Sequence, residues 1–177
     1  NKGLTSLIEV LKYIAVSQYR SLEHKIKTFE QFLVTIESFF DFIDFNAAMH
    51  PFLSFQNKPQ AVVAITSDSG LLGGLNMQVV TAAVKELEKT AGKLIIIGER
   101  GKMYAQDFKM PFVAFPGIKE EDRLAQALPL RDYIFNKCQA GAFGNLKVVF
   151  PRPVSFTVQK VEVVTFLPFS TQEQPKP

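Results

Sequence analysis

The sequence contains few of the residues that build metal centres and nucleophile sites. It has one cysteine, Cys138, and only two histidines, His24 and His50, which lie far apart. A single thiol cannot form an internal disulfide, so the composition suits a reducing compartment. No C-x-x-C or H-E-x-x-H spacing occurs. The residues therefore predict no metal site, no cofactor and no catalytic constellation, and Cys138 is expected to be a core thiol.

Long apolar runs and a strong charge excess are also missing. No run approaches the roughly 18 apolar residues of a membrane span, and Asn1 begins nothing that resembles a signal peptide. Lysine and arginine number 20 against 17 acidic residues, a net charge of +3. That excess is small and forms no basic stripe interleaved with aromatic residues, so no nucleic-acid partner is predicted. Hydrophobic residues make up 47% of the chain, and most of it is expected to fold.

Glycine and proline are absent from residues 4–50, which Gly3 and Pro51 flank as breakers. Within this stretch, residues recur at steps of four and three, with one polar member and one slip, as in a coiled coil. We call this set the apolar seam: Leu4, Ile8, Leu11, Ala15, Gln18, Leu22, Ile26, Phe29, Leu33, Ile36, Phe40 and Ile43. An unbroken helix here would be roughly 60–70 Å long.

Two other readings of this stretch remain open. It could be an amphipathic helix packed on its own domain, or two helices joined by a turn between Thr28 and Phe29. Because no later segment is helical for long enough to pair with it, the seam favours a partner outside these residues. Bases outnumber acids before Phe29, which fits either a solvated face or an acidic partner surface.

From residue 61 the pattern changes to strands that alternate with helices. Short β-branched apolar runs predict strands at 61–66, 93–97, 112–115, 146–150 and 160–167, with helices at 76–91 and 119–136. This alternation predicts a Rossmann-like α/β domain with a mostly parallel, doubly wound sheet. The last two strands are joined by residues 151–159 without a helix, so we expect them to pair antiparallel at one edge.

The second predicted helix contains a possible irregularity. Leu124, Leu128 and Ile134 are spaced for burial, while Pro129 is expected to kink or split the helix.

A glycine-rich loop at residues 67–75 joins the first strand to the first helix of this domain, where α/β folds often hold phosphate. Its glycines run G-x-x-G-G, not G-x-G-x-x-G, and it lacks the lysine of a P-loop. Glu99, just past the second strand, is a weak candidate for a ribose ligand. A tight turn in which Asn76 or Ser67 satisfies exposed amides is favoured over a nucleotide site, although a small nucleotide- or phosphate-binding domain remains the alternative.

The motif I-T-S-D-S-G-L-L-G-G-L-N at residues 65–76 and three shorter segments resemble the gamma subunit family of rotary F-type ATP synthases. Residues 12–20, K-Y-I-A-V-S-Q-Y-R, resemble K-M-V-A-A-S-K-L-R of its N-terminal helix. Residues 65–76, I-T-S-D-S-G-L-L-G-G-L-N, resemble its signature I-T-S-D-R-G-L-C-G-G-L-N. Residues 97–101 match I-G-x-x-G, and residues 166–168 are similar to L-L-P. The order and approximate spacing agree over nearly the whole chain, and the twelve-residue signature is the specific part.

The resemblance implies a non-catalytic rotor subunit of the central stalk, without a cofactor, that couples rotation to ATP synthesis or hydrolysis in its partners. It implies an axle helix at 1–50, a linker at 51–60, a Rossmann-like domain at 61–169 and a disordered tail at 170–177. The implied partners are the ring of alpha- and beta-type catalytic subunits, a small epsilon-type subunit and the membrane rotor ring, at the cytoplasmic face of a membrane. Lys12 and Arg20 are the positions implied to face acidic loops of the catalytic subunits.

The resemblance also assigns the loop a structural signature, made of Ser67, Asp68, Gly70, Gly73, Gly74 and Asn76. Departures from the family pattern include Ser69 in place of arginine, Leu72 in place of a small residue or cysteine, and Tyr13 and Gln18 in the N-terminal helix. In the family a C-terminal helix coils around the N-terminal one. The sequence stops where that helix would start, so a missing C-terminal helix or a substitute coiled-coil partner is expected to cover the seam.

Overall fold

The computed structural model describes residues 2–40, 52, 58–70, 72, 74–90, 92–119, 121–155 and 158–168; within the N-terminal helix it describes the side chains of residues 3–25. The chain forms two units, the N-terminal helix and a sheet domain. Residues 41–50, most of the predicted linker and the predicted disordered tail at 170–177 lie outside the described residues, and the predicted domain boundaries stay predictions.

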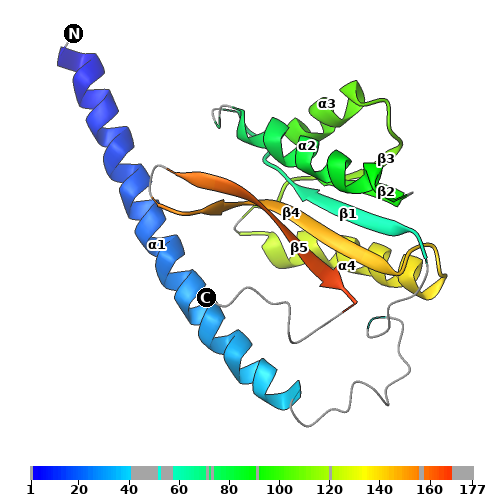
Figure 1. The fold of residues 1–177 in the computed structure, drawn as a ribbon. Helices are drawn as coiled ribbons and strands as arrows, with labels where there is room; N and C mark the ends of the chain where they lie inside the picture. The colour runs from blue at the N-terminus through cyan, green and yellow to red at the C-terminus, as the bar shows by residue number, and fades with distance from the viewer. Residues whose placement is uncertain are drawn as a thin grey trace. The chain divides into compact units, whose positions relative to one another are not determined.

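The N-terminal helix α1 (Lys2–Phe40) is one continuous helix of 39 residues, about 58 Å long at 1.5 Å per residue (Figure 1). It runs without a break across Thr28 and Phe29, so the alternative of two helices joined there is wrong. Gly3, expected to flank the helix, lies within its first turn. The seam side chains Leu4, Ile8, Leu11 and Leu22 are 61%, 58%, 56% and 51% exposed.

The sheet domain contains five strands in the order β3-β2-β1-β4-β5. The strands are β1 (Gln60–Ile65), β2 (Gly92–Ile97), β3 (Phe112–Phe115), β4 (Asn145–Pro153) and β5 (Gln159–Leu167). The first four are parallel and β5 pairs antiparallel with β4 at one edge, as the sequence predicts. Strand β1 lies at the centre, where Ala61, Val62, Val63 and Ala64 are at most 2% exposed because helices cover both faces.

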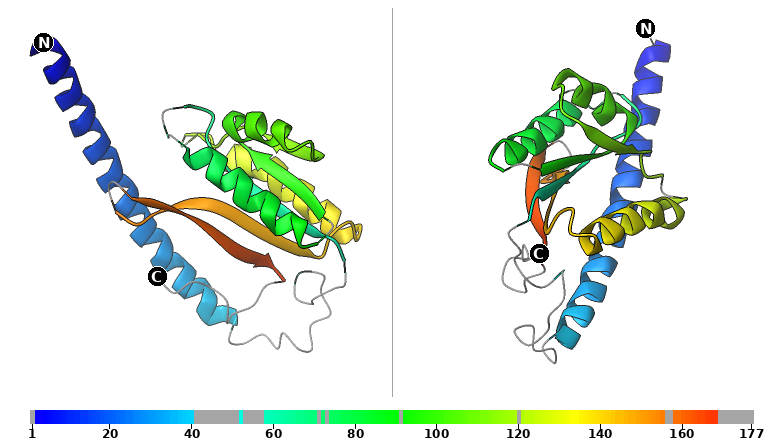
Figure 2. Two further views of the ribbon diagram at one scale, coloured as in Figure 1. Left: turned by 45° about the horizontal axis from the view of Figure 1, so that its top comes forward. Right: turned by 90° about the vertical axis from the view of Figure 1, so that its right-hand side faces the viewer.

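Three helices complete the doubly wound arrangement: α2 (Leu75–Glu88), α3 (Glu99–Asp107) and α4 (Arg123–Gln139). Figure 2 shows α2 and α3 on one face of the sheet and α4 on the other. On the α2 face, Val79, Val80, Ala83, Val84 and Leu87 pack against strand residues such as Val62 and Leu94. On the α4 face, Cys138, Leu130, Tyr133 and Ile134 pack against Ala61, Val63, Ile95 and Ile97. The predicted Rossmann-like fold is therefore confirmed.

Several local predictions need correction. Helix α3 was not predicted, since its nine residues bury only Gly101 and Ala105 and show no apolar periodicity. Helix α4 begins at Arg123, not at residue 119, and continues through Pro129 without splitting. Leu124 and Leu128, predicted to be buried, are 73% and 38% exposed, because the buried face of α4 is the one that carries Leu130, Ile134 and Cys138.

The strands of the β4–β5 hairpin extend further than predicted. Strand β4 continues to Pro153 and β5 begins at Gln159, so four of the nine residues of the predicted link at 151–159 are paired strand. Strand β1 pairs with β4 only as far as Val149. The remainder of the hairpin is a two-stranded ribbon, on which Arg152 pairs with Glu162 at 3.2 Å.

An ion-pair cluster joins α2 to β4. The Glu86 carboxylate accepts hydrogen bonds from the Lys147 ammonium at 2.6 Å and from the Lys89 ammonium, and its side chain is only 13% exposed. Hydrogen bonds from Lys147 and then Lys89 hold the pKa of Glu86 below its ordinary value, against the opposing effect of burial. Both lysines also offset the unfavourable position of a carboxylate in the last turn of α2.

We predict that Glu86→Gln lowers the free energy of unfolding by about 1 kcal/mol at neutral pH, since it removes the charge from two hydrogen bonds. Because the folded pKa of Glu86 is lowered, its contribution is complete above the carboxyl pKa of the unfolded chain and is lost as pH falls through the folded pKa. Urea unfolding followed by circular dichroism should therefore show the two proteins converging in acid. The control is Glu88→Gln on the exposed side of α2; a gap between wild type and Glu86→Gln that widens in acid would contradict this assignment.

Candidate functional site

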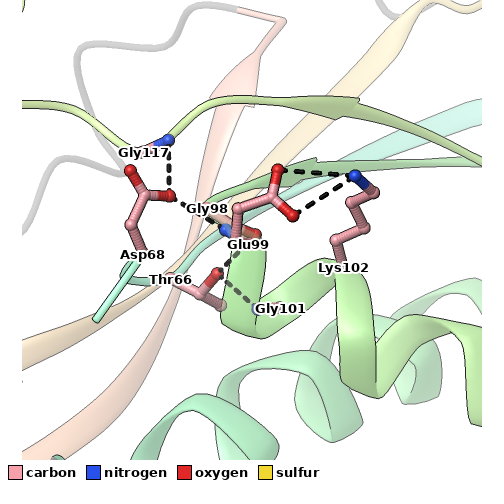
Figure 3. Close-up of polar contacts among 7 residues, drawn as sticks. All are labelled: Thr66, Asp68, Gly98, Glu99, Gly101, Lys102 and Gly117. Atoms are coloured by element: carbon pink, nitrogen blue, oxygen red, sulfur yellow. Dashed lines mark hydrogen bonds and ion pairs between the residues drawn. The ribbon is translucent and has the colours of Figure 1, made fainter. Parts of the chain in front are cut away.

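The glycine-rich loop between β1 and α2 lies at the carboxyl edge of the parallel strands, where open α/β sheets bind ligands. Helix α3 begins at the same edge, directly after β2. Figure 3 shows how Thr66 and Asp68 from the loop point toward the first turn of α3 and toward Gly117, which follows β3. The site is therefore built from three successive strand ends.

Thr66 bridges the ends of β1 and β2. Its hydroxyl donates a hydrogen bond to the carbonyl of Ile97 at 2.5 Å and accepts one from the amide of Gly101 at 3.0 Å. Thr66 is only 8% exposed. The Ile97 carbonyl also accepts from the Thr66 backbone amide at 2.9 Å, so loss of the hydroxyl would mainly leave the Gly101 amide without its acceptor. A Cβ on Gly101 would stand 2.3 Å from the Thr66 hydroxyl oxygen, so this approach requires glycine.

Asp68 joins the next two strand ends. One carboxylate oxygen accepts hydrogen bonds from the amides of Glu99 and Gly117, each at 2.9 Å. Glu99 is the first residue of α3, so Asp68 satisfies one of the free amides of that helix and places a negative charge at its positive end. A Cβ on Gly117 would lie 2.5 Å from the same oxygen, which again requires glycine.

Ser67 and Asn76 close the loop on itself. The Asn76 side-chain oxygen accepts from the amide of Ser67 at 3.2 Å, and its amide nitrogen donates to the Ser67 hydroxyl at 2.9 Å. The Ser67 hydroxyl in turn donates to the carbonyl of Ser69 at 2.6 Å. Asn76 is 5% exposed in the first turn of α2. These bonds form the kind of tight turn expected from the sequence, with Asn76 satisfying the Ser67 amide.

The glycines of the loop are less constrained than those opposite it. A Cβ on Gly70 would meet only the mobile end of the Arg100 side chain, at 2.9 Å, and a Cβ on Gly74 has no neighbour nearer than 3.8 Å. Gly73 lies outside the described residues. Sequence reasoning did not identify Thr66 and Gly117 as members of the site; Gly101 was visible only in the short I-G-x-x-G match.

This network occupies the end of α3 that could have held a phosphate. The first three amides of the helix are bound by protein acceptors: Asp68 holds Glu99, the Ser67 carbonyl holds Arg100 at 3.0 Å, and Thr66 holds Gly101. The Asp68 carboxylate would also repel an anion there. The Glu99 carboxylate pairs with Lys102 at 3.2 Å, on the surface. The start of α3 is therefore a structural joint. The nucleotide alternative concerns the start of α2, which no side chain caps; the glycine spacing of the loop and its missing lysine are what argue against it.

The described residues support neither a reactive thiol nor a metal site. Cys138 is 3% exposed in the core beneath α4, and burial raises the pKa of its thiol despite the nearby charge of Lys58, which keeps the sulfur protonated and unreactive. Among the described residues, no group of three histidine, cysteine, aspartate or glutamate side chains is arranged to hold a metal ion. No helix in the described part of the chain is both long and apolar enough to cross a membrane.

Lys12 and Arg20, the two positions implied to contact a partner, are not near this loop in sequence but lie on α1. Both side chains are exposed. Eight residues separate them, which places them about 12 Å apart along the helix axis and about 80° apart around it. They therefore lie on the same half of the helix surface.

Comparison with known proteins gives a consistent result. The model of the ATP synthase family matches residues 2–177. The ATP synthase gamma chain of Clostridium acetobutylicum is 34% identical over 117 residues, which cover 64% of this chain and 42% of the relative. The ATP synthase gamma chain of Desulforamulus reducens is 24% identical, over 99% of this chain and 64% of the relative. The chain thus spans less than two thirds of the length of either relative.

A solved structure supports the fold. The chain matches a cryo-EM structure of the central stalk and c-ring of the Tetrahymena thermophila mitochondrial ATP synthase, with a TM-score of 0.54 and 18% sequence identity. The match covers 65% of this chain and 52% of the other.

We predict that Asp68→Ala lowers the free energy of unfolding by about 2 kcal/mol, because the amides of Glu99 and Gly117 lose their acceptor. Asp68→Asn retains a side-chain oxygen and should cost less than half as much. Denaturant unfolding of both variants measures the difference, with Ser69→Ala, a neighbouring exposed side chain, as a control that should change stability by less than about 0.5 kcal/mol. Equal losses for alanine and asparagine would show that these hydrogen bonds are not what stabilises the joint.

Proposed function

This chain belongs to the ATP synthase family, and on that premise we propose that it is a non-catalytic gamma-type subunit of the central stalk of a rotary ATP synthase. In this role it couples rotation to ATP synthesis or hydrolysis carried out by partner subunits. The observation that carries the proposal is the exposed seam on α1: Leu4, Ile8, Leu11 and Leu22 are each more than half exposed. A helix of this length with such a face needs a covering partner.

The covering partner is a second helix from outside the 177 residues. The seam has the four- and three-residue steps of a coiled coil, which suit helix-on-helix packing better than packing on a sheet. A two-stranded coiled coil is stiff enough to serve as an axle. Its rotation would present different faces to the surrounding subunits, so that each angle favours a different catalytic-site conformation.

Lys12 and Arg20 make the electrostatic contacts of this axle. They lie on the same half of the α1 surface, in the part of the chain where bases outnumber acids before Phe29. Their partners are acidic loops of the alpha- and beta-type catalytic ring. Contacts of this kind steer and position a partner more than they add affinity.

The sheet domain forms the foot of the stalk. We place it against a small epsilon-type subunit and the membrane rotor ring, at the cytoplasmic face of the membrane. The similarity of the fold to a central stalk solved together with a c-ring supports this arrangement. The network of Thr66, Ser67 and Asp68 suits a domain that transmits force, because it ties three strand ends into one rigid unit.

The alternative, a small nucleotide- or phosphate-binding domain, is not favoured. The loop has neither the lysine nor the glycine spacing of a phosphate cradle. The chain therefore works without a cofactor of its own.

We predict that the double variant Lys12→Glu with Arg20→Glu, reconstituted with the catalytic subunits, lowers coupled ATPase activity about tenfold, because it turns attraction to acidic loops into repulsion. Circular dichroism should show an unchanged fold. The matched control is Lys119→Glu with Arg131→Glu, which makes the same charge change at exposed positions of the sheet domain. Normal activity of the α1 variant in a fully assembled complex would exclude a role for these two positions.

We also predict that the purified chain shows no saturable binding of ATP or NAD in calorimetric titration up to millimolar ligand. The reason is that the loop lacks the P-loop lysine and the G-x-G-x-x-G spacing that these ligands need. Stoichiometric micromolar binding that Gly73→Val abolishes would instead support the nucleotide-binding alternative.

A further inference from the structure

The excess positive charge of the sheet domain lies at one edge of the sheet. In a parallel sheet, the residues before each strand and the last turns of the covering helices meet at the amino edge. Seven lysines lie there, before or at the start of the parallel strands and at the ends of the helices: Lys58, Lys85, Lys89, Lys93, Lys109, Lys137 and Lys147. Among the described residues, only three acidic ones accompany them, Glu86, Glu88 and Asp107. We call this set the amino-edge patch.

Three contacts show that these elements meet at one edge. The amide of Gly144, before β4, donates to the carbonyl of Pro59, before β1, at 3.1 Å. The Gln60 side chain donates to the carbonyl of Glu86 at 3.3 Å. The Lys58 ammonium lies 3.4 Å from the position that a Cβ on Gly141 would take, at the end of α4. The lysines before β1, on β4 and at the ends of α2 and α4 therefore belong to one surface.

The rest of the domain carries no net charge. Residues 58–168 contain fourteen basic and ten acidic residues. Outside the amino-edge patch, seven basic residues are therefore balanced by seven acidic residues. The whole excess of four positive charges lies at the amino edge. Lys85, Lys89, Lys93 and Lys109 are exposed there. The dipoles of helix C-termini explain Lys85 and Lys137, but not Lys93, which stands at the start of β2.

The chemistry of the patch suits a diffuse anionic surface. All seven of its bases are lysines, whereas the four arginines of the domain, Arg100, Arg123, Arg131 and Arg152, lie elsewhere. Lysine is a flexible, hydrated point charge, while arginine forms the bidentate pairs typical of contacts with defined carboxylates. Two exposed rings lie near the same edge, Phe108 at 37% and Phe166 at 58% exposure. Aromatic rings beside lysines are typical of the interface between water and lipid headgroups.

From this division of charge we infer that the amino-edge patch binds the surface of a membrane that contains anionic lipids. The inference goes beyond the proposed function, since a rotor subunit needs contacts with proteins only. The attraction is electrostatic, reversible and sensitive to salt, and each lysine near the surface raises the affinity about fivefold.

The test is flotation of the full chain with vesicles of phosphatidylcholine containing about 30% phosphatidylserine, a charge density typical of anionic leaflets. Wild type should bind at low ionic strength, should release as salt is raised, and should not bind pure phosphatidylcholine. The variant Lys85→Gln, Lys93→Gln, Lys109→Gln should bind about a hundredfold more weakly. The matched control, Lys119→Gln, Arg131→Gln, Lys160→Gln, removes the same charge from exposed positions elsewhere on the domain and should bind like wild type.

Four results would overturn the inference. Absence of binding by wild type at low salt would show that the patch does not recognise lipid. Equal losses in both triple variants would mean that only net charge matters, and undiminished binding by the patch variant would assign the binding to another surface, such as the exposed face of α1. Binding to polyglutamate without binding to vesicles would identify the partner as an acidic protein segment instead.

Discussion

The sheet domain depends on how the free amides at the start of α3 are satisfied. Helix N-termini leave amides that need acceptors, and here the acceptors come from three consecutive residues, Thr66, Ser67 and Asp68, which follow a different strand. The same segment reaches Gly117 beyond β3. A loop that in other α/β proteins would leave room for a ligand is thereby used to fasten β1, β2 and β3 to one another.

The two units differ in how much of their apolar surface they bury. The sheet domain buries its central strand completely, with Ala61 and Val62 fully covered by helices on both faces. Helix α1 leaves Leu4, Ile8 and Leu11 exposed, and its stability must come from packing against another helix. A self-sufficient domain attached to a helix with an exposed apolar face fits the proposed role as a subunit of a larger assembly.

Sequence patterns predicted the parts of the fold that local periodicity controls. The runs AVVAI and KLIII are continuous and β-branched, so β1 and β2 were recognised within one residue of their ends. Helix α3 was missed because it buries only Gly101 and Ala105, too few residues to create a pattern. On α4 the spacing of Leu124 and Leu128 fitted one face, but the sheet lies against another, and only tertiary packing decides between them. At the glycine-rich loop, the signature indicated a structural role. One of the two amides that Asp68 binds belongs to Gly117, 49 residues later in the chain, and no local pattern connects the two residues.

The central position of β1 has a consequence for how the protein is made. On one side Gln60 pairs with Gly92, and on the other it pairs with Asn145, near the end of the domain. During synthesis, β2 can join β1 early, whereas the opposite edge of the most apolar strand stays open until β4 has emerged. An unpaired apolar edge invites pairing with other nascent chains. The order of the strands therefore leaves one edge of β1 unpaired in the growing chain for the whole interval between the emergence of β2 and that of β4.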